Sequence, residues 1–295
     1  MYTVGNVSYK AFFASVHHHH HSLLQNNLYR LQKEQIMRAG FMMNPDIYLY
    51  RVIKGIRNTF DSFGYIEIFP EAVEKYSRSF SDGVPFVYAN KFYLINPDIT
   101  SRLILRNFSE NTRIFYIYEK LSRSLESEIE AGLELINVNE EKSNIEILRV
   151  LIKTLENLGI YDFKIDISVS NIFSGKIGKR NYEKIREYIK MNDFNAIKNS
   201  GIKKEYIDYV IKMLNSRGTD INVELLNNIK SAVNDDRIII DPGTVRYFSY
   251  YSGLIFEIYS DDYFIGGGGN YKIKNSNGCG FSLNTLVLSK ILRRL

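Results

Sequence analysis

Carboxylates and an arginine occur in this sequence in an arrangement that could bind a small zwitterion. Glu130 and Glu134 are four residues apart in a predicted strand, residues 129–136, and an even spacing on a strand directs both side chains to one face. Arg246 precedes a pair of tyrosines and another predicted strand. Carboxylates bind an ammonium group and an arginine binds a carboxylate, so the set has the chemistry to hold a free amino acid.

The alternative interpretation is that these residues are structural. The chain has 22 tyrosines, so a single tyrosine is more often a packing residue than a ligand contact. Isolated carboxylates are most often solvated surface groups. Only the complete set, at a recognisable spacing, favours a pocket.

The composition excludes several other chemistries. All five histidines form one run, residues 17–21, which we interpret as a tag or vector-derived leader rather than a metal-binding tract. Outside that run there is no histidine for a Ser-His or Cys-His pair or for a zinc site. Cys279 is the single cysteine and can form no internal disulfide, which fits a reducing cytoplasm. We expect no metal and no cofactor.

Neither a membrane nor a nucleic acid is an expected partner. The sequence has no apolar run long enough to span a bilayer, and its first residues lack the long apolar stretch of a signal peptide. The net charge of +5 is mild, and its densest basic clusters are residues 176–180 and 293–294. Because nucleic-acid binders concentrate such charge on one face, we interpret these clusters as solvated helix surface.

The elements that would position the candidate groups begin near Asp46, which can cap a helix that ends at Gly64. We expect residues 1–45 to be a leader or a tag-derived segment and residues 46–295 to be one domain. Asn96–Thr100 forms a turn that opens a helix through Asn107. Strand patterns, including a hairpin around Ala89-Asn90, occur at residues 65–69, 85–88, 91–95, 113–118 and 129–136.

The second half of the chain is predicted to carry a helical insertion at about residues 175–235. Ser143 and Glu146 form a capping-box signature that starts a helix before it. Strand patterns occur at residues 163–167, 237–240, 254–259 and 263–265, and a last helix covers residues 283–295. Strands on both sides of a helical block predict an α+β fold with a mostly antiparallel sheet flanked by helices.

The four glycines at residues 266–269 are not a phosphate-binding loop by pattern. No Lys-Ser/Thr pair and no helix start follow them. Close approach of the backbone beneath a bound ligand explains them better.

Several segments together resemble class II histidyl-tRNA synthetases. NPDITSRLILR (residues 96–106) resembles that family's RPE/D-x-T-x-x-x-x-R segment. YIYEKLSRSLESEIEAGLELI (residues 116–136) resembles motif 2, FRYE…REFxQAGVELIG. Residues 245–282 resemble RGLDYYTG…FE…GGRYD…GF, and GYIEIFPEAVE (residues 64–74) resembles motif 1. Each match is short, but their common order makes the resemblance specific.

The resemblance implies a class II synthetase core, with an antiparallel sheet of six or seven strands and a homodimer through the motif 1 region. It also implies a histidine pocket. Asp98, Thr100 and Glu130 match positions that bind the α-amino group, and Glu134 and Tyr251 match positions that read the imidazole. The complete set of implied histidine-binding residues is Asp98, Thr100, Glu130, Glu134, Arg246, Tyr250, Tyr251, Gly268 and Tyr271.

Two further roles follow from the same resemblance, and so do departures that concern ATP. Arg246 matches the arginine on the carboxylate and phosphate side, and Tyr271 matches the residue that closes the pocket. The motif 2 and motif 3 arginines align with Ile117 and Val287. Because loss of one charge-stabilising donor costs ~10²–10³ in rate, we expect no aminoacylation. We also expect no anticodon-binding domain.

A synthetase-like core without these arginines resembles the regulatory subunit family of ATP phosphoribosyltransferase. This resemblance implies no catalytic residues, assembly with the short-form catalytic subunit, and histidine as an effector. Two alternatives stay open: a synthetase-like paralog that binds another amino acid or a tRNA, and an enzyme that still activates histidine. Glu130 replaces a common glutamine, and Tyr247 and Ser249 replace the glycine and aspartate of RGLDYY, so the ligand's identity is open too.

Overall fold

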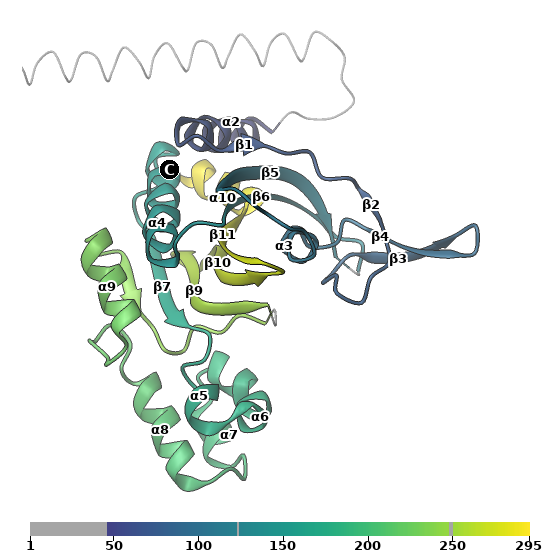
Figure 1. Cartoon of the computed structure of the whole chain (residues 1–295). Helices are drawn as coiled ribbons and strands as arrows, with labels where there is room; N and C mark the ends of the chain where they lie inside the picture. The colour runs from purple at the N-terminus through teal and green to yellow at the C-terminus, as the bar shows by residue number, and fades with distance from the viewer. Residues whose placement is uncertain (1–45, 123, 248–249) are drawn as a thin grey trace, which may run out of the picture. The chain divides into compact units, whose positions relative to one another are not determined.

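The computed structural model describes residues 46–122, 124–247 and 250–295 (Figure 1). The expected leader, residues 1–45, lies outside the described residues, as does Ser249. Tyr48–Leu295 forms one compact unit. None of the helices in the described part is long and apolar enough to cross a membrane.

The centre of the fold is an eight-stranded sheet with the order β1-β5-β6-β11-β10-β9-β7-β8. Its neighbouring strands are antiparallel except for the outermost pairs, β1–β5 and β7–β8, which are parallel. This confirms the α+β class and the mostly antiparallel sheet. The strands are β1 (Ile66–Glu67), β5 (Thr112–Leu121), β6 (Ser127–Ile136), β7 (Lys164–Val169), β8 (Ile238–Ile240), β9 (Tyr251–Ser260), β10 (Tyr263–Ile273) and β11 (Ser276–Asn284).

One face of this sheet packs against the helices α2 (Ile47–Ser62), α4 (Glu140–Asn157) and α10 (Thr285–Arg294). Phe60 of α2 lies edge-on to Phe115 of β5 and to Phe281 of β11, with ring centroids 5.3 and 5.9 Å apart. The apolar positions of α4 recur every three or four residues and are buried in the same core. The opposite face of the sheet is therefore left for other side chains.

A second, smaller core lies on that opposite face. It contains Tyr116 and Tyr118 of β5, Ile136 of β6 and Tyr271 of β10, packed with the short helix α3 (Ile99–Leu103). Strand alternation explains the division, because neighbours such as Phe115 belong to the helix-covered core instead. The same alternation places Glu130 and Glu134 on one face of β6, as predicted.

A three-stranded sheet, with the order β2-β4-β3, precedes α3. It consists of β2 (Val73–Lys75), β3 (Val84–Tyr88) and β4 (Lys91–Ile95). The predicted hairpin around Ala89-Asn90 is confirmed, with both residues at positive φ (48° and 61°) as a tight two-residue turn requires.

Helices α5 to α9 lie between β7 and β8, where the sequence predicts a helical insertion (Figure 1). Tyr209 donates a hydrogen bond to the carbonyl of Ile172, and α9 packs on α4. Arg217 joins the insertion to the sheet through Asp166 and Asp241, at 2.8 and 3.0 Å. The helices are α5 (Ser174–Ile177), α6 (Lys179–Lys190), α7 (Phe194–Lys198), α8 (Lys204–Leu214) and α9 (Glu224–Val233).

The predicted capping box is wrong. Helix α4 begins at Glu140 and is capped by Asn139, whose side chain accepts from the Lys142 amide. Ser143 therefore lies inside the first turn, where its hydroxyl donates to the Glu140 carbonyl. Glu146 is used elsewhere, because it forms a 2.8 Å ion pair with Arg113.

The glycine region was also predicted incorrectly. β10 does not end at Ile265 but runs through all four glycines, and β11 follows at residues for which no strand was predicted. A Cβ atom at Gly266 or Gly268 would collide with the carbonyl oxygen of Ser282 or Gly280 on β11. The close backbone approach is therefore that of the neighbouring strands. The helix predicted to run through Asn107 is shorter as well, since α3 ends at Leu103.

Candidate functional site

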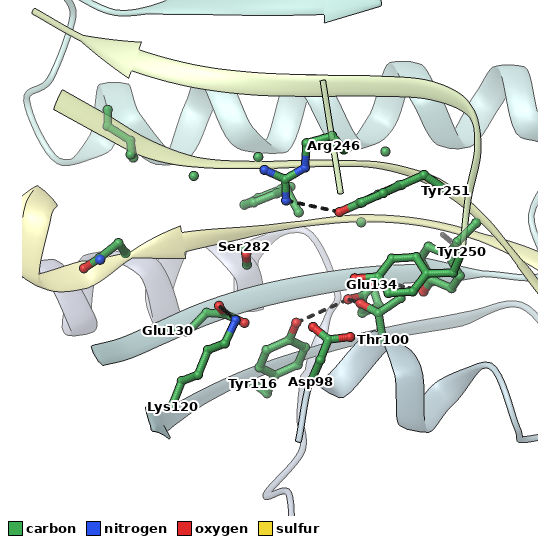
Figure 2. Close-up of a pocket in the computed structure, with 18 of the residues that line it drawn as sticks. Asp98, Thr100, Tyr116, Lys120, Glu130, Glu134, Arg246, Tyr250, Tyr251 and Ser282 are labelled. Atoms are coloured by element: carbon green, nitrogen blue, oxygen red, sulfur yellow. Dashed lines mark hydrogen bonds and ion pairs between the residues drawn. The ribbon is translucent and has the colours of Figure 1, made fainter. Parts of the chain in front are cut away.

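A pocket of about 190 Å³ opens among β5, β6, β9, β10, β11 and the start of α3 (Figure 2). Gly268 does not line it, although Gly266, Gly267 and Gly269 do. Its backbone is instead packed against β11. The other predicted residues all line the pocket: Asp98, Thr100, Glu130, Glu134, Arg246, Tyr250, Tyr251 and Tyr271.

Glu134 lies at the buried end of the pocket and accepts three hydrogen bonds. Thr100 and Tyr116 donate to its Oε1 at 3.2 and 3.3 Å, and Tyr271 donates to its Oε2 at 2.6 Å. Burial raises the pKa of Glu134 to about 8, although the Tyr271 hydrogen bond opposes the shift. Gly280 leaves the space that this carboxyl group occupies. Near neutral pH, Glu134 can therefore exchange a proton with a ligand.

Asp98 supplies a second, fixed carboxylate. It is the N-cap of α3, and its Oδ2 accepts from the Ser101 amide at 2.8 Å. Burial raises its pKa, and the charge of Lys120 opposes that shift. The capping bond fixes the orientation of the Asp98 side chain, so this carboxylate is preorganised to receive a cation.

Glu130 forms a third acidic position and has a cationic partner. Lys120 Nζ lies 3.5 Å from Glu130 Oε2 and 3.5 Å from Asp82 Oδ2. Burial lowers the pKa of Lys120, but the facing carboxylates, led by Glu130, raise it by more, so the lysine stays charged. The positive charge of Lys120 is thus already balanced by carboxylates of the protein itself.

Arg246 occupies the side of the pocket opposite these acids (Figure 2). Its Nη2 donates to the Tyr251 hydroxyl at 3.3 Å, and its Nη1 lies 3.7 Å from Glu257. Its buried Nε has no hydrogen-bond partner within the described residues. A Cβ atom at Gly267 would lie 2.8 Å from the guanidinium, so glycine leaves room for it. Beyond the single bond to Tyr251, the Nη groups of Arg246 therefore retain donors for an anionic ligand group.

Tyrosine rings form the wall between the two ends. The Tyr250 ring lies 4.8 Å from that of Tyr251 and 6.3 Å from that of Tyr271, measured between centroids. Burial is the main cause that raises the pKa of all three hydroxyl groups, so they stay neutral. They can donate or accept hydrogen bonds and also pack against a flat ring.

The pocket also includes residues that the sequence analysis missed. Tyr116 and Lys120 are four apart on β5, the same even spacing that identified the two glutamates on β6. That spacing could have identified Tyr116 and Lys120 from the sequence. The remaining missed side chains contribute less to the argument and are Glu128, Phe264, Ile265, Phe281, Ser282 and Asn284.

The two positions aligned with the ATP-binding arginines do not contribute to the pocket. Ile117 and Val287 both pack against the helix-covered core. Among the described residues, the cations that line the pocket are Lys120 and Arg246 alone. No group of acids, histidines and cysteines suited to a metal ion occurs in the described part of the chain.

Comparisons with known proteins agree with this architecture. An ATP phosphoribosyltransferase regulatory subunit from Caldanaerobacter subterraneus subsp. tengcongensis is 27% identical, over 68% of this chain and 65% of its own length. A histidine–tRNA ligase from Methanocaldococcus jannaschii is 25% identical, over 69% of this chain and 60% of its own length. Each of these two relatives is therefore matched over less than two thirds of its length.

The fold is shared with a solved structure, an ATP phosphoribosyl transferase (HisG:HisZ) complex from Thermotoga maritima. The TM-score is 0.65 at 18% identity, over 81% of this chain and 97% of that chain. The sequence profile described as Histidyl-tRNA synthetase matches residues 102–222 and 179–288, which together span more than half of this chain. The chain therefore belongs to the histidyl-tRNA synthetase family and has its class II core fold.

Proposed function

We propose that the chain is a non-catalytic regulatory subunit of ATP phosphoribosyltransferase and binds histidine as a feedback effector. One observation carries this proposal. The pocket has a complete set of groups for a free amino acid, while its described lining contains more carboxylates than cations. Such a lining suits an ammonium group and disfavours a triphosphate.

Histidine fits the pocket by charge and by hydrogen bonding. Its ammonium group would be received by Asp98 and Glu130, and its carboxylate by Arg246. The two ring nitrogens would meet Glu134 and the Tyr251 hydroxyl. The acids and Arg246 face the pocket from opposite sides, so the ammonium group and the carboxylate on the ligand's α-carbon could each meet an opposite charge (Figure 2).

ATP fits the same lining poorly. Asp98, Glu128, Glu130 and Glu134 contribute carboxyl groups, and Lys120 is already paired with Glu130 and with an aspartate outside the pocket. Phosphoryl transfer and adenylate formation depend on free cationic groups that stabilise negative charge. Among the described residues that line the pocket, Arg246 is therefore the one cation left to stabilise that charge.

The partner is proposed from the comparisons. The relative from C. subterraneus is named as a regulatory subunit of ATP phosphoribosyltransferase, and the T. maritima structure is a complex of that transferase. We infer that this chain assembles with a short-form catalytic subunit. Histidine would then inhibit by binding one state of the assembly more tightly than another, since an effector shifts a population only by its differential affinity.

The ligand is tested by titration calorimetry with histidine and the other nineteen amino acids. We expect histidine to bind, and Glu134→Gln to weaken binding by roughly 10- to 100-fold, because an amide cannot release a proton and so cannot offer the ligand a negatively charged acceptor. Glu119→Gln, an exposed change on β5, is the matched control and should bind normally. Tight binding of another amino acid instead of histidine would support the paralog alternative.

Catalysis is tested by pyrophosphate exchange with histidine and ATP. We expect no exchange above background, and measurable exchange would show a histidine-activating enzyme.

The partner is tested by co-expression with a short-form phosphoribosyltransferase. The expected result is a stable complex whose transferase activity falls when histidine is added, whereas a complex that fails to form would contradict the regulatory role.

A further inference from the structure

Helix α6 of the insertion contacts Tyr247, the residue that follows Arg246 of the pocket. The Tyr247 hydroxyl donates to Glu187 Oε2 at 3.0 Å. Lys190 Nζ lies 4.2 Å from the centroid of the Tyr247 ring, and the Arg186 guanidinium carbon lies 5.4 Å from it. These helical positions are three and four residues apart, so they form one face that holds the tyrosine.

Arg246 itself makes few polar side-chain contacts, although its side chain is only 14% exposed. Its polar contacts within the described residues are the 3.3 Å bond to Tyr251 and the 3.7 Å approach to Glu257, and its Nε has no partner there. Its guanidinium carbon also lies 5.5 Å from the centroid of the Tyr251 ring, so its position depends on that ring and on its own backbone. That backbone is continuous with Tyr247, which α6 holds from the other side.

We propose that Tyr247 and Glu187 are positioning residues, through which the helical insertion sets where Arg246 meets the ligand's carboxylate. The inference rests on the proposed function, because it assumes an amino-acid ligand. In the synthetase pattern RGLDYY, glycine stands where this chain has Tyr247. A glycine has no side chain that α6 could contact. The connection is thus a feature of this chain's own residues.

The connection works in both directions. If the α6 contact improves carboxylate binding, the bound carboxylate strengthens the α6 contact by the same factor, because coupling between two sites is reciprocal. The insertion then reports whether the pocket is occupied. In a regulatory subunit, this gives the effector a physical path from the pocket to an outer helical surface.

The test compares two ligands that differ in one group. Histidine carries the carboxylate and histidinol lacks it. Tyr247→Phe and Glu187→Ala, which remove the donor and the acceptor of that bond, should each weaken histidine binding by roughly three- to tenfold, the effect of one hydrogen bond, and should leave histidinol binding unchanged. The double variant should be no weaker than either single variant, because both changes remove the same bond.

Tyr188→Phe is the matched control, since Tyr188 lies on α6 beside Glu187 and is 37% exposed. It should bind both ligands as the unmodified chain does. Equal losses for histidine and histidinol would show a general structural defect and would overturn the inference. An unchanged affinity for histidine in both variants would overturn it as well.

A second measurement separates this inference from the proposed function. If the unmodified chain binds neither ligand, the histidine proposal fails, and crystal structures of the variants then decide the positioning role. Tyr247→Phe and Glu187→Ala should displace the Arg246 guanidinium from the Tyr251 hydroxyl, while Tyr188→Phe should not. An Arg246 side chain that keeps its place in both variants would overturn the positioning role independently of any ligand.

Discussion

At Glu134, three neutral hydroxyl groups converge on one buried carboxyl group. Thr100, Tyr116 and Tyr271 each donate to it, and only 2% of the glutamate is exposed. Burial disfavours the charged form more than these bonds favour it, which is why its pKa rises to about 8. A residue that holds a proton in the empty pocket can release it when a cationic or ring-nitrogen ligand arrives.

The shift predicts how stability depends on pH. The pKa of Glu134 is about 8 in the folded protein and 4.5 ordinarily, so between these values the folded state binds a proton that the unfolded chain has released. Its contribution is therefore full at low pH and is lost as the pH rises through 8. Thermal unfolding measured from about pH 5 to about pH 9 should show this decline.

The Glu134→Gln variant isolates the contribution of this group. Glutamine is uncharged and similar in shape, so the variant should lose less stability than the unmodified chain as the pH rises. Glu119→Gln should follow the unmodified chain. Parallel curves for Glu134→Gln and the unmodified chain would show that another group causes the decline.

The paired strands β10 and β11 are the element on which the pocket depends most. Their glycines allow the two backbones to approach closely, and this approach brings Tyr271 of β10 opposite Gly278 and places Gly280 beside Glu134. A side chain at these points would separate the strands. The glycine series is therefore a packing requirement of the sheet that also opens the space beneath Arg246.

Gly268→Ala tests that requirement. The added methyl group would collide with the Gly280 carbonyl, so we expect a loss of about 1–3 kcal/mol in the free energy of unfolding, as for other overpacked sites. Gly175→Ala is the control, because its Cβ would lie 3.8 Å from the nearest side-chain atom. Denaturant unfolding should separate the two variants, and equal stability would contradict the packing argument.

At the scale of the whole molecule, apolar side chains are exposed along the edge formed by β1. Ile66 is 70% exposed and Phe69 is 81% exposed, and β1 pairs on one side only, with β5. Exposed apolar residues at a sheet edge are uncommon in a monomer without a partner. This segment is the motif 1 region, for which we propose a second copy of the chain as the occupant.

Phe69→Asp should disrupt that homodimer. A charge placed in an apolar interface has to be desolvated without a partner, so we expect the variant to be monomeric where the unmodified chain is dimeric. Size-exclusion chromatography with light scattering measures the mass directly. Tyr161→Asp, at another exposed aromatic residue, should stay dimeric. A monomeric unmodified chain would contradict the proposal.

Local periodicity was sufficient for much of the fold, whereas the set of pocket residues came from the resemblance to histidyl-tRNA synthetases. The three- and four-residue repeat of α2 and the even spacing of Glu130 and Glu134 are properties of neighbouring residues, so they can be recognised in the sequence. The hairpin at Ala89-Asn90 is local in the same sense. Eight of the nine candidate residues line one pocket, and their histidine-binding roles stay predictions.

Other features needed the tertiary structure, because they depend on contacts between distant segments. A run of glycines does not resemble a strand until β9 and β11 are seen to crowd β10 from both sides. Ser143 and Glu146 match a cap by pattern, but the helix starts earlier and Glu146 binds Arg113 on β5. The ion pairs of Lys120 with Glu130 and Asp82, and the contacts of α6 with Tyr247, are likewise non-local.

The sequence by itself determined which residue types face together, because strand and helix periods are set by the backbone of a few neighbouring residues. Only the tertiary structure decided how deeply each charge is buried and which partner it meets. Burial raises the pKa of Glu134, and the partners that each side chain meets balance the charge of Lys120 and leave Arg246 with free donors. They arise when segments far apart in the chain exclude water from a common space.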